Sequence, residues 1–204
     1  MGLVALVVVV AAVLAAATGG RWHDLTTIHL RGMPLVAGAI VTQVLGAVLA
    51  DHAGKGWWYT AGLTVSATCA LAFCLANLRI AGIPLVALGL VINAAVVARN
   101  GAMPVSIYSA HRAGVSIFSI ATGNDPRHTI AGPQSVWRSL GDVIPVPLPG
   151  IPQVVSPGDV LVAAGLGEFI VMTARRRRRD EEDQAAGGEN SQASQALSTI
   201  ARRS

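Results

Sequence analysis

Five long apolar stretches constrain this chain more than any other feature: residues 2–18, 33–50, 57–76, 80–98 and 157–174. Each is close to the roughly 20 apolar residues that a helix needs to cross a hydrocarbon layer about 30 Å thick. The chain is 52% hydrophobic and only 13% charged, whereas a soluble domain carries about a quarter charged residues. The pattern therefore predicts an all-α fold, a polytopic transmembrane helical bundle of about five spans.

The lengths of the intervening segments predict how the chain is organised around this bundle. We expect residues 1–179 to form the transmembrane unit, with a long extracytoplasmic connector at 99–156 between the fourth and fifth spans. Residues 180–204 are rich in Gly, Ser, Gln and Ala without apolar periodicity, which indicates a disordered cytoplasmic tail. Residues 2–18 could instead be a signal peptide, although no Lys or Arg precedes them.

A run of arginines directly follows the last apolar stretch and predicts the orientation. Clustered arginine holds the adjacent end of a span on the cytoplasmic side, so we expect the N-terminus outside and the C-terminus inside. The predicted partners are the lipid bilayer and its anionic headgroups, and no protein partner is indicated. The net charge of +4 gives no reason to expect nucleic acid, because the dense basic block already serves as a topology signal. The run consists of Arg175, Arg176, Arg177, Arg178 and Arg179.

Three polar residues of the predicted spans form the candidate intramembrane site: Gln43, Asn93 and Glu168. A carboxylate in lipid is costly unless it is protonated, paired or hydrated, so Glu168 is a candidate proton or ion site. Its alternative is a side chain that tilts toward the interface and meets water or an arginine. Gln43 and Asn93 are interpreted as interhelical hydrogen-bonding residues, with a ligand role as the alternative.

The connector contains several local signals. Residues 105–121 are mildly apolar and are interpreted as an interfacial or re-entrant helix rather than another crossing. The later part is rich in proline and should be extended and turn-rich. Ser156 followed by Pro157 and Asp159 predicts a capped helix start. Asn100-Gly101 predicts a tight turn.

Metal and cofactor motifs are not found in the sequence, and neither a metal site nor a cofactor is predicted. His111, Asp125 and His128 are interpreted as ordinary loop residues, because no further ligand stands at a useful spacing. Cys69 and Cys74 lie within an apolar run and are interpreted as buried thiols.

One short motif occurs twice in the chain. Residues 32–37 read Gly-Met-Pro-Leu-Val-Ala, and residues 82–87 read Gly-Ile-Pro-Leu-Val-Ala. Gln43 then falls where Asn93 falls. The echo indicates either a generic helix entry or a duplicated two-helix unit of the kind that builds some transporters.

From Ile83 onward the chain resembles an uncharacterised bacterial membrane family, the domain of unknown function 5317. The resemblance rests on four blocks: Gly82-Ile83-Pro84-Leu85 with Gly89 and Asn93, Asn100 to Val105, Leu140 to Pro145, and Ser156 to Leu161. It implies a bacterial inner membrane and no assigned activity. From these blocks and the charged groups beside them we take a candidate outer-face motif: Arg99, Asn100, Gly101, Met103, Pro104, Asp142, Ser156 and Asp159.

Three functions remain open from the sequence. The first is a structural or regulatory component of the inner membrane without enzymatic activity. The second is a small transporter or ion-coupled carrier that uses Glu168, Gln43 and Asn93. The third is a membrane-embedded enzyme acting on lipid or envelope precursors, with Asp142, Arg99 and His111. Scattered, satisfied polar groups would favour the first, polar groups on facing spans the second, and a converging loop cluster the third.

Overall fold

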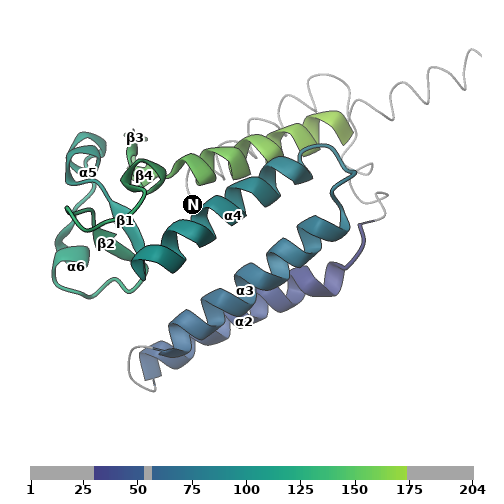
Figure 1. Ribbon diagram of the computed structural model, residues 1–204, viewed down its shortest axis with the longest axis horizontal. Coiled ribbons are helices and arrows are strands. Elements are labelled where there is room, and N and C mark those ends of the chain that lie inside the picture. The colour runs from purple at the N-terminus through teal and green to yellow at the C-terminus, as the bar shows by residue number, and fades with distance from the viewer. Residues whose placement is uncertain (1–29, 53–56, 174–204) are drawn as a thin grey trace, which may run out of the picture.

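The computed structural model describes residues 30–52 and 57–173. In this part of the chain, long helices lie side by side and a small folded unit covers one end of them (Figure 1). The predicted first span at 2–18, the arginine run at 175–179 and the predicted tail at 180–204 lie outside the described residues.

The first helix pair is formed by α2 (Met33–His52) and α3 (Trp57–Ala76), which pack closely against each other. Their backbones approach where Gly46 faces Gly62: a Cβ added to Gly46 would lie 2.9 Å from the Cα of Gly62. Small residues at such a contact allow two helices to approach closely, as they do in membrane bundles. The predicted span 57–76 has the bounds of α3, and α2 extends slightly beyond the predicted 33–50.

The second pair is formed by α4 (Ile83–Asn100) and helix 157–173, which run in opposite directions (Figure 1). α4 starts at Ile83 rather than at residue 80, because Gly82 has φ 84° and makes a left-handed turn before it. The turn between α3 and α4 is held by Asn77, whose side chain accepts from Arg31 N–H at 2.9 Å and donates to Arg31 O at 2.8 Å.

The sequence echo corresponds to a shared helix entry. Gly32 and Gly82 both have φ near +80°, and each is followed by a helix with proline in its first turn. α2 and α4 also run in the same direction (Figure 1). Both a generic helix entry and a duplicated two-helix unit would give this shared start.

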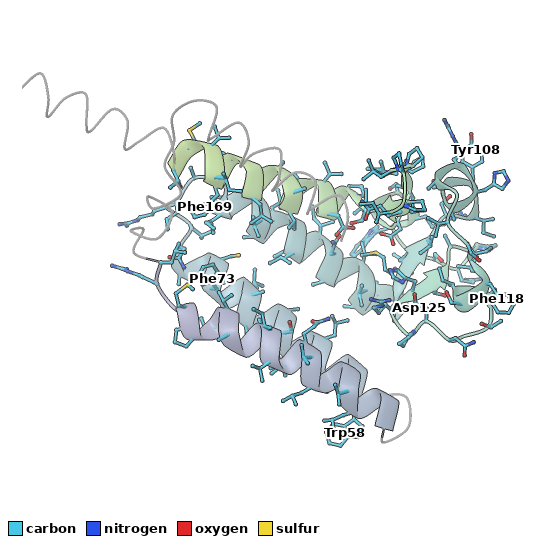
Figure 2. The ribbon with its side chains drawn as sticks, turned by 180° about the vertical axis from the view of Figure 1, so that it is seen from behind. Trp58, Phe73, Tyr108, Phe118, Asp125 and Phe169 are labelled. Atoms are coloured by element: carbon cyan, nitrogen blue, oxygen red, sulfur yellow. The ribbon has the colours of Figure 1, made fainter. Side chains whose placement is uncertain are left out.

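A small apolar core joins the two pairs at the end where α3 stops and α4 starts. Phe73 of α3 and Phe169 of helix 157–173 both pack against it, and Figure 2 shows them at this end. The buried members of this core are Cys74, Ile83, Val86 and Ala87. Cys74 is therefore buried as predicted, whereas Cys69 is half-buried; both are free thiols.

At the other end of α4, the predicted connector folds into a compact unit that we call the cap, residues 101–156. It contains strands β1 (Met103–Val105), β2 (His128–Ile130), β3 (Ile144–Val146) and β4 (Gln153–Val155). β1 pairs with β2 in parallel, with Met103 opposite His128, and β3 pairs with β4 antiparallel. Asp142 forms a bridge with Val105 on the other side of β1. The prediction of an all-α fold is therefore wrong for the cap, although the described chain is mostly helical.

The segment 105–121 is not one interfacial or re-entrant helix. It forms two short helices, α5 (Ile107–Ala113) and α6 (Phe118–Ala121). The break occurs at Gly114, a left-handed C-cap with φ 74°. A short 3-10 helix, η2 (Arg138–Leu140), follows later in the cap.

By length and composition, α4 is the helix among the described residues that could cross a membrane. α2 and α3 contain shorter apolar helical stretches, Met33–Gly46 and Ala61–Ala76. The structure therefore supports a mostly helical fold with one candidate span in its described part, and the five-span bundle stays a prediction.

Candidate functional site

Six polar side chains gather where the cap meets α4 and helix 157–173. They come from five segments: α4, the loop before β2, β2 itself, the bridge beside β1, and the start of helix 157–173. We call this group the junction cluster: Asn93, Asp125, His128, Asp142, Ser156 and Asp159. In Figure 2, Asp125 lies at this end of the helices, within the cap.

Ser156 and Asp159 cap helix 157–173 in a reciprocal arrangement. Asp159 N–H donates to Ser156 Oγ at 3.0 Å, and Ser156 N–H donates to Asp159 Oδ2 at 3.1 Å. Two backbone donors at the helix start are thereby satisfied, and the carboxylate lies at the positive end of the helix dipole. This arrangement is the helix start that the sequence predicts.

Asn93 of α4 connects to both capping residues across the helix pair. Its Nδ2 donates to Asp159 Oδ1 at 2.8 Å, and its Oδ1 accepts from the Ser156 hydroxyl at 2.9 Å. Both ends of the amide are therefore used. Asn93 is an interhelical hydrogen-bonding residue here, and its partners lie on the helix start rather than at Glu168 or Gln43.

The helix pair closes tightly around Asn93 at glycines. A Cβ on Gly158 would collide with Asn93 Oδ1 and would lie 2.8 Å from Gly89 O. A Cβ on Gly89 would in turn collide with Gly158 O. Only glycine fits at either position, and this close approach places the Asn93 amide beside the capping residues.

Asp142 is held by its backbone on one side of β1. Its N–H donates to Pro104 O at 2.9 Å, and its carbonyl accepts from Ser106 N–H at 2.9 Å. Gly141 packs so closely on Pro104 O that a Cβ there would collide with it. The Asp142 carboxyl is thereby fixed near the start of helix 157–173, with 8% of its side chain exposed.

His128 lies between the two carboxylates of the cap, which belong to Asp125 and Asp142. Its Nδ1 lies 2.8 Å from Asp125 Oδ2, and its Nε2 lies 3.6 Å from Asp142 Oδ2. The imidazole is 31% exposed, whereas the Asp125 side chain is 14% exposed. The three side chains therefore form a row in which the imidazole, the most exposed member, lies between two largely buried carboxyls.

The two cap carboxylates have opposite pKa shifts. Burial, the largest cause, raises the pKa of Asp142 to about 7; the negative charge of Asp159 adds to the rise, and His128 opposes it. For Asp125, burial alone would raise the pKa. Hydrogen bonds from His128 and from Arg127 N–H, with the positive charges of these two residues, outweigh burial and hold it below its ordinary value.

The remaining outer-face residues build the α4 end of the cap. Asn100 ends α4, donates to Val136 O at 3.0 Å and accepts from Val136 N–H at 2.8 Å. Gly101 follows as the left-handed C-cap, and its N–H donates to Val97 O at 2.8 Å. This is the turn that Asn100-Gly101 predicts. Arg99 is exposed in the last turn of α4.

The residue after Val136, Trp137, has an unusual backbone conformation. Trp137 has φ 54° and ψ 44°, a left-handed conformation that bulky residues rarely adopt, and its side chain is 49% exposed. Among non-glycine residues of the described chain it has the only positive φ. The two hydrogen bonds from Asn100 hold the backbone of Val136, immediately before this residue.

The candidate intramembrane residues do not come together. Glu168 is nine positions beyond Asp159 on the same helix, so it lies about 13 Å further along the axis than the residue that Asn93 contacts. Gln43 lies on α2, whose main packing partner is α3. Within the described residues, neither Gln43 nor Glu168 has a hydrogen bond or ion pair with a protein group.

Sequence reasoning missed Asp125 and His128, which it interpreted as ordinary loop residues. The i, i+3 spacing of these two residues in Asp125-Pro126-Arg127-His128 was the available signal. It could not reveal Asp142 as the third member, because that contact depends on β1 lying between β2 and residue 142. His111 is exposed on α5 and takes no part in the cluster.

No group of three or more His, Cys, Asp or Glu side chains in residues 30–52 and 57–173 is arranged to hold a metal ion. The cluster instead has the chemistry of proton exchange and hydrogen bonding, because it combines an imidazole, three carboxyls, an amide and a hydroxyl.

Comparison with known proteins gives one match. The sequence profile of a family of unknown function, DUF5317, matches residues 27–171, which is more than half of the chain. No curated protein matches the chain, and no solved structure does.

Proposed function

The chain belongs to the family of unknown function DUF5317, and we propose that it is a multi-pass protein of the bacterial inner membrane with a structural or regulatory role. Five spans cross the bilayer, the N-terminus lies outside, the C-terminus lies inside, and the cap covers the outer ends of α4 and helix 157–173. The arginines from Arg175 to Arg179 meet anionic headgroups at the inner surface.

The observation that supports membrane insertion is the apolar surface of the long helices. α2 exposes seven large apolar side chains: Met33, Ile40, Val41, Val44, Leu45, Val48 and Leu49. α3 contains no charged residue, and α4 contains one, Arg99, in its last turn. Leaving this much apolar surface in water would be strongly unfavourable, whereas lipid matches it.

The dimensions of the helices also support this proposal. α2 and α3 have 20 residues each, which corresponds to about 30 Å of helix, and α4 has 18. These lengths are close to the thickness of a hydrocarbon core. The charged residues of α2 and α4 lie at helix ends, where an interface would place them.

The structural or regulatory role is supported by how the polar groups of the cap are used. Asn100 holds the backbone of Val136, and the Ser109 hydroxyl donates to Val143 O at 2.6 Å. Ser156 and Asp159 cap a helix. Side chains occupied in this way position the chain and leave few polar groups free to act on a substrate.

The carrier is the second candidate, favoured by one observation: Asn93 and Asp159 hydrogen-bond on facing helices. Gln43 and Glu168 do not join them. A proteoliposome assay of proton and sodium flux tests this candidate. Flux above that of empty vesicles, and its loss in Glu168→Gln or Asn93→Ala, would favour the carrier over the structural role.

The enzyme hypothesis has less support. Its proposed residues Asp142, Arg99 and His111 do not contact one another within the described chain, and Asp142 faces His128 instead. Arg99 and His111 are both exposed.

Membrane insertion and orientation can be tested together in a variant that lacks Cys69 and Cys74. One cysteine is introduced at Ile151, which is exposed in the loop between β3 and β4 of the cap, or at Ser204. We expect both proteins to remain in membranes after alkaline washing. A membrane-impermeant maleimide added to intact cells should label the cysteine at position 151 and spare the one at 204. The reverse labelling pattern would refute the orientation, and a protein that stays folded in buffer without detergent would refute insertion.

A further inference from the structure

We propose that Asp142 is a proton-binding site that exchanges its proton with solvent through His128, and that occupancy of this site controls how firmly the cap is joined to the helix pair. This site is formed by residues of the cap together with Asp159 of helix 157–173, and its chemistry needs no bilayer. It therefore stands apart from the proposed membrane location.

The first observation is an almost completely buried carboxyl without a hydrogen-bonding partner. The Asp142 side chain is 8% exposed, and within the described residues its two oxygens accept no hydrogen bond. Its ion-pair partner among the described residues is His128, whose Nε2 lies 3.6 Å from Asp142 Oδ2, beyond hydrogen-bond length. An ionised carboxylate in such a place is poorly solvated, whereas the protonated form is neutral and carries its own donor.

The second observation is the set of charges around Asp142. Asp159, on helix 157–173, lies close enough for its negative charge to oppose ionisation of Asp142, and His128 on β2 favours it. Asp125 lies behind His128 and contacts its Nδ1. α4 contributes the neutral amide of Asn93, and β1 contributes no titratable group. The ionisable side chains of α5, His111 and Arg112, are exposed.

The third observation is a route from this carboxyl to solvent. Asp125 Oδ2 accepts from Nδ1–H of His128, so a neutral imidazole presents an unprotonated Nε2 toward Asp142. When the 3.6 Å gap shortens to hydrogen-bond length, the carboxylic acid transfers its proton to Nε2, leaving Asp142 as carboxylate and His128 as imidazolium. His128 is 31% exposed and releases that proton to water. Asp125 is the positioning residue that fixes the ring.

The fourth observation connects this proton to the fold. The backbone of Asp142 holds β1 through Pro104 and Ser106, while Asp159 holds the start of helix 157–173 and Asn93. When Asp142 is protonated, the cap and the helix pair meet without charge repulsion. When it ionises, two carboxylates face each other at the joint. The proton therefore acts on the contact between the cap and the helices.

Infrared titration of the full chain in detergent can test the proposal. The carbonyl stretch of a protonated carboxyl is separate from that of a carboxylate, so the difference between wild type and Asp142→Asn isolates this one group. We expect that difference spectrum to contain a carboxylic acid band that disappears with a midpoint near pH 7. Glu168→Gln is the matched control, because it removes another carboxyl of the bundle and should leave this band unchanged.

Two variants of the neighbours keep the test valid even if Asp142→Asn fails to fold. Asp159→Asn keeps a capping side chain but removes a negative charge, so the midpoint should fall. His128→Gln removes the imidazole that takes up the proton and becomes positive beside the carboxylate, so the midpoint should rise, and proton exchange should slow. A titration midpoint near the ordinary aspartate value of about 4, or one that neither neighbour shifts, would overturn the proposal.

Discussion

The side chain of Asn93 donates a hydrogen bond of 2.8 Å to Asp159, although the two residues are 66 positions apart in the sequence. The same amide accepts from Ser156, so one residue of α4 satisfies both residues that cap helix 157–173. The start of this helix is consequently joined to α4 as well as to the cap. Because of these hydrogen bonds, the packing of α4 against helix 157–173 and the docking of the cap depend on each other.

Asn93→Leu should therefore destabilise the protein by about 2 kcal/mol or more, because a Ser156 hydroxyl and an Asp159 oxygen would lose their partner in a tightly packed place. Thermal unfolding in detergent, followed by the reaction of buried Cys74 with a thiol dye in a Cys69→Ala background, would measure the loss. Gln43→Leu is the matched control and should change the midpoint little, because Gln43 makes no hydrogen bond to another described residue. Equal losses in both variants would contradict this account.

Gly158→Ala should lower the stability of the protein about as much as Asn93→Leu, for a steric reason. The added Cβ would collide with Asn93 Oδ1 and press on Gly89 O, and overpacking of this kind costs typically ~1–3 kcal/mol. Gly132→Ala is the control, because nothing lies within 4 Å of a Cβ at Gly132. The same unfolding assay separates the two. A tolerated Gly158→Ala together with a harmful Gly132→Ala would show that the helix pair does not pack as described.

The end of α4 offers a local test. Asn100→Ala removes both hydrogen bonds to the Val136 backbone, and the left-handed Trp137 would relax without them. Hydrogen exchange of the peptide containing residues 134–140 should then become roughly tenfold faster or more. Asn124→Ala, in an exposed loop of the same cap, should leave that peptide unchanged. Unaltered exchange in Asn100→Ala would mean that the hydrogen bonds from Asn100 to Val136 do not maintain the conformation of Trp137.

These contacts also show what could be predicted from the sequence. The bounds of α3 and the capped start at Ser156 follow from local signals: a long apolar run and a Ser-x-x-Asp pattern. Asn93 could be assigned to interhelical hydrogen bonding because an amide in an apolar helix needs a partner. Its particular partner could not be predicted, because the sequence places Asp159 at a helix start and in the outer-face motif, and says nothing of which residue of α4 lies opposite it.

The cap was less predictable because its strands have three residues each. Such short strands show no periodicity, and their register depends on partners far along the chain. β1 alone brings His128 and Asp142 to the same place, one across each of its edges. The row of Asp125, His128 and Asp142 therefore could not be predicted from the spacing of these residues in the sequence.

The raised pKa of Asp142 predicts how stability should depend on pH. Between the ordinary value of 3.8 and about 7, the folded protein holds a proton that the unfolded chain has released. The contribution of Asp142 to stability is therefore fully present below about pH 4 and is lost as the pH rises toward 7, by at most about tenfold in the folding equilibrium per pH unit. Asp125, with its lowered pKa, acts in the opposite sense and only below its ordinary value of 3.8.

Thermal unfolding followed by circular dichroism between pH 4.5 and pH 7.5 would measure this dependence in detergent. Wild type should lose stability across the range, whereas Asp142→Asn should lose much less, because its side chain cannot ionise. Asp125→Asn serves as the comparison: its effect at Asp125 itself lies below pH 4, so it should keep most of the wild-type slope. If wild type instead gains stability as the pH rises through this range, and Asp142→Asn follows it, Asp142 is ionised in the folded protein and the junction holds no proton.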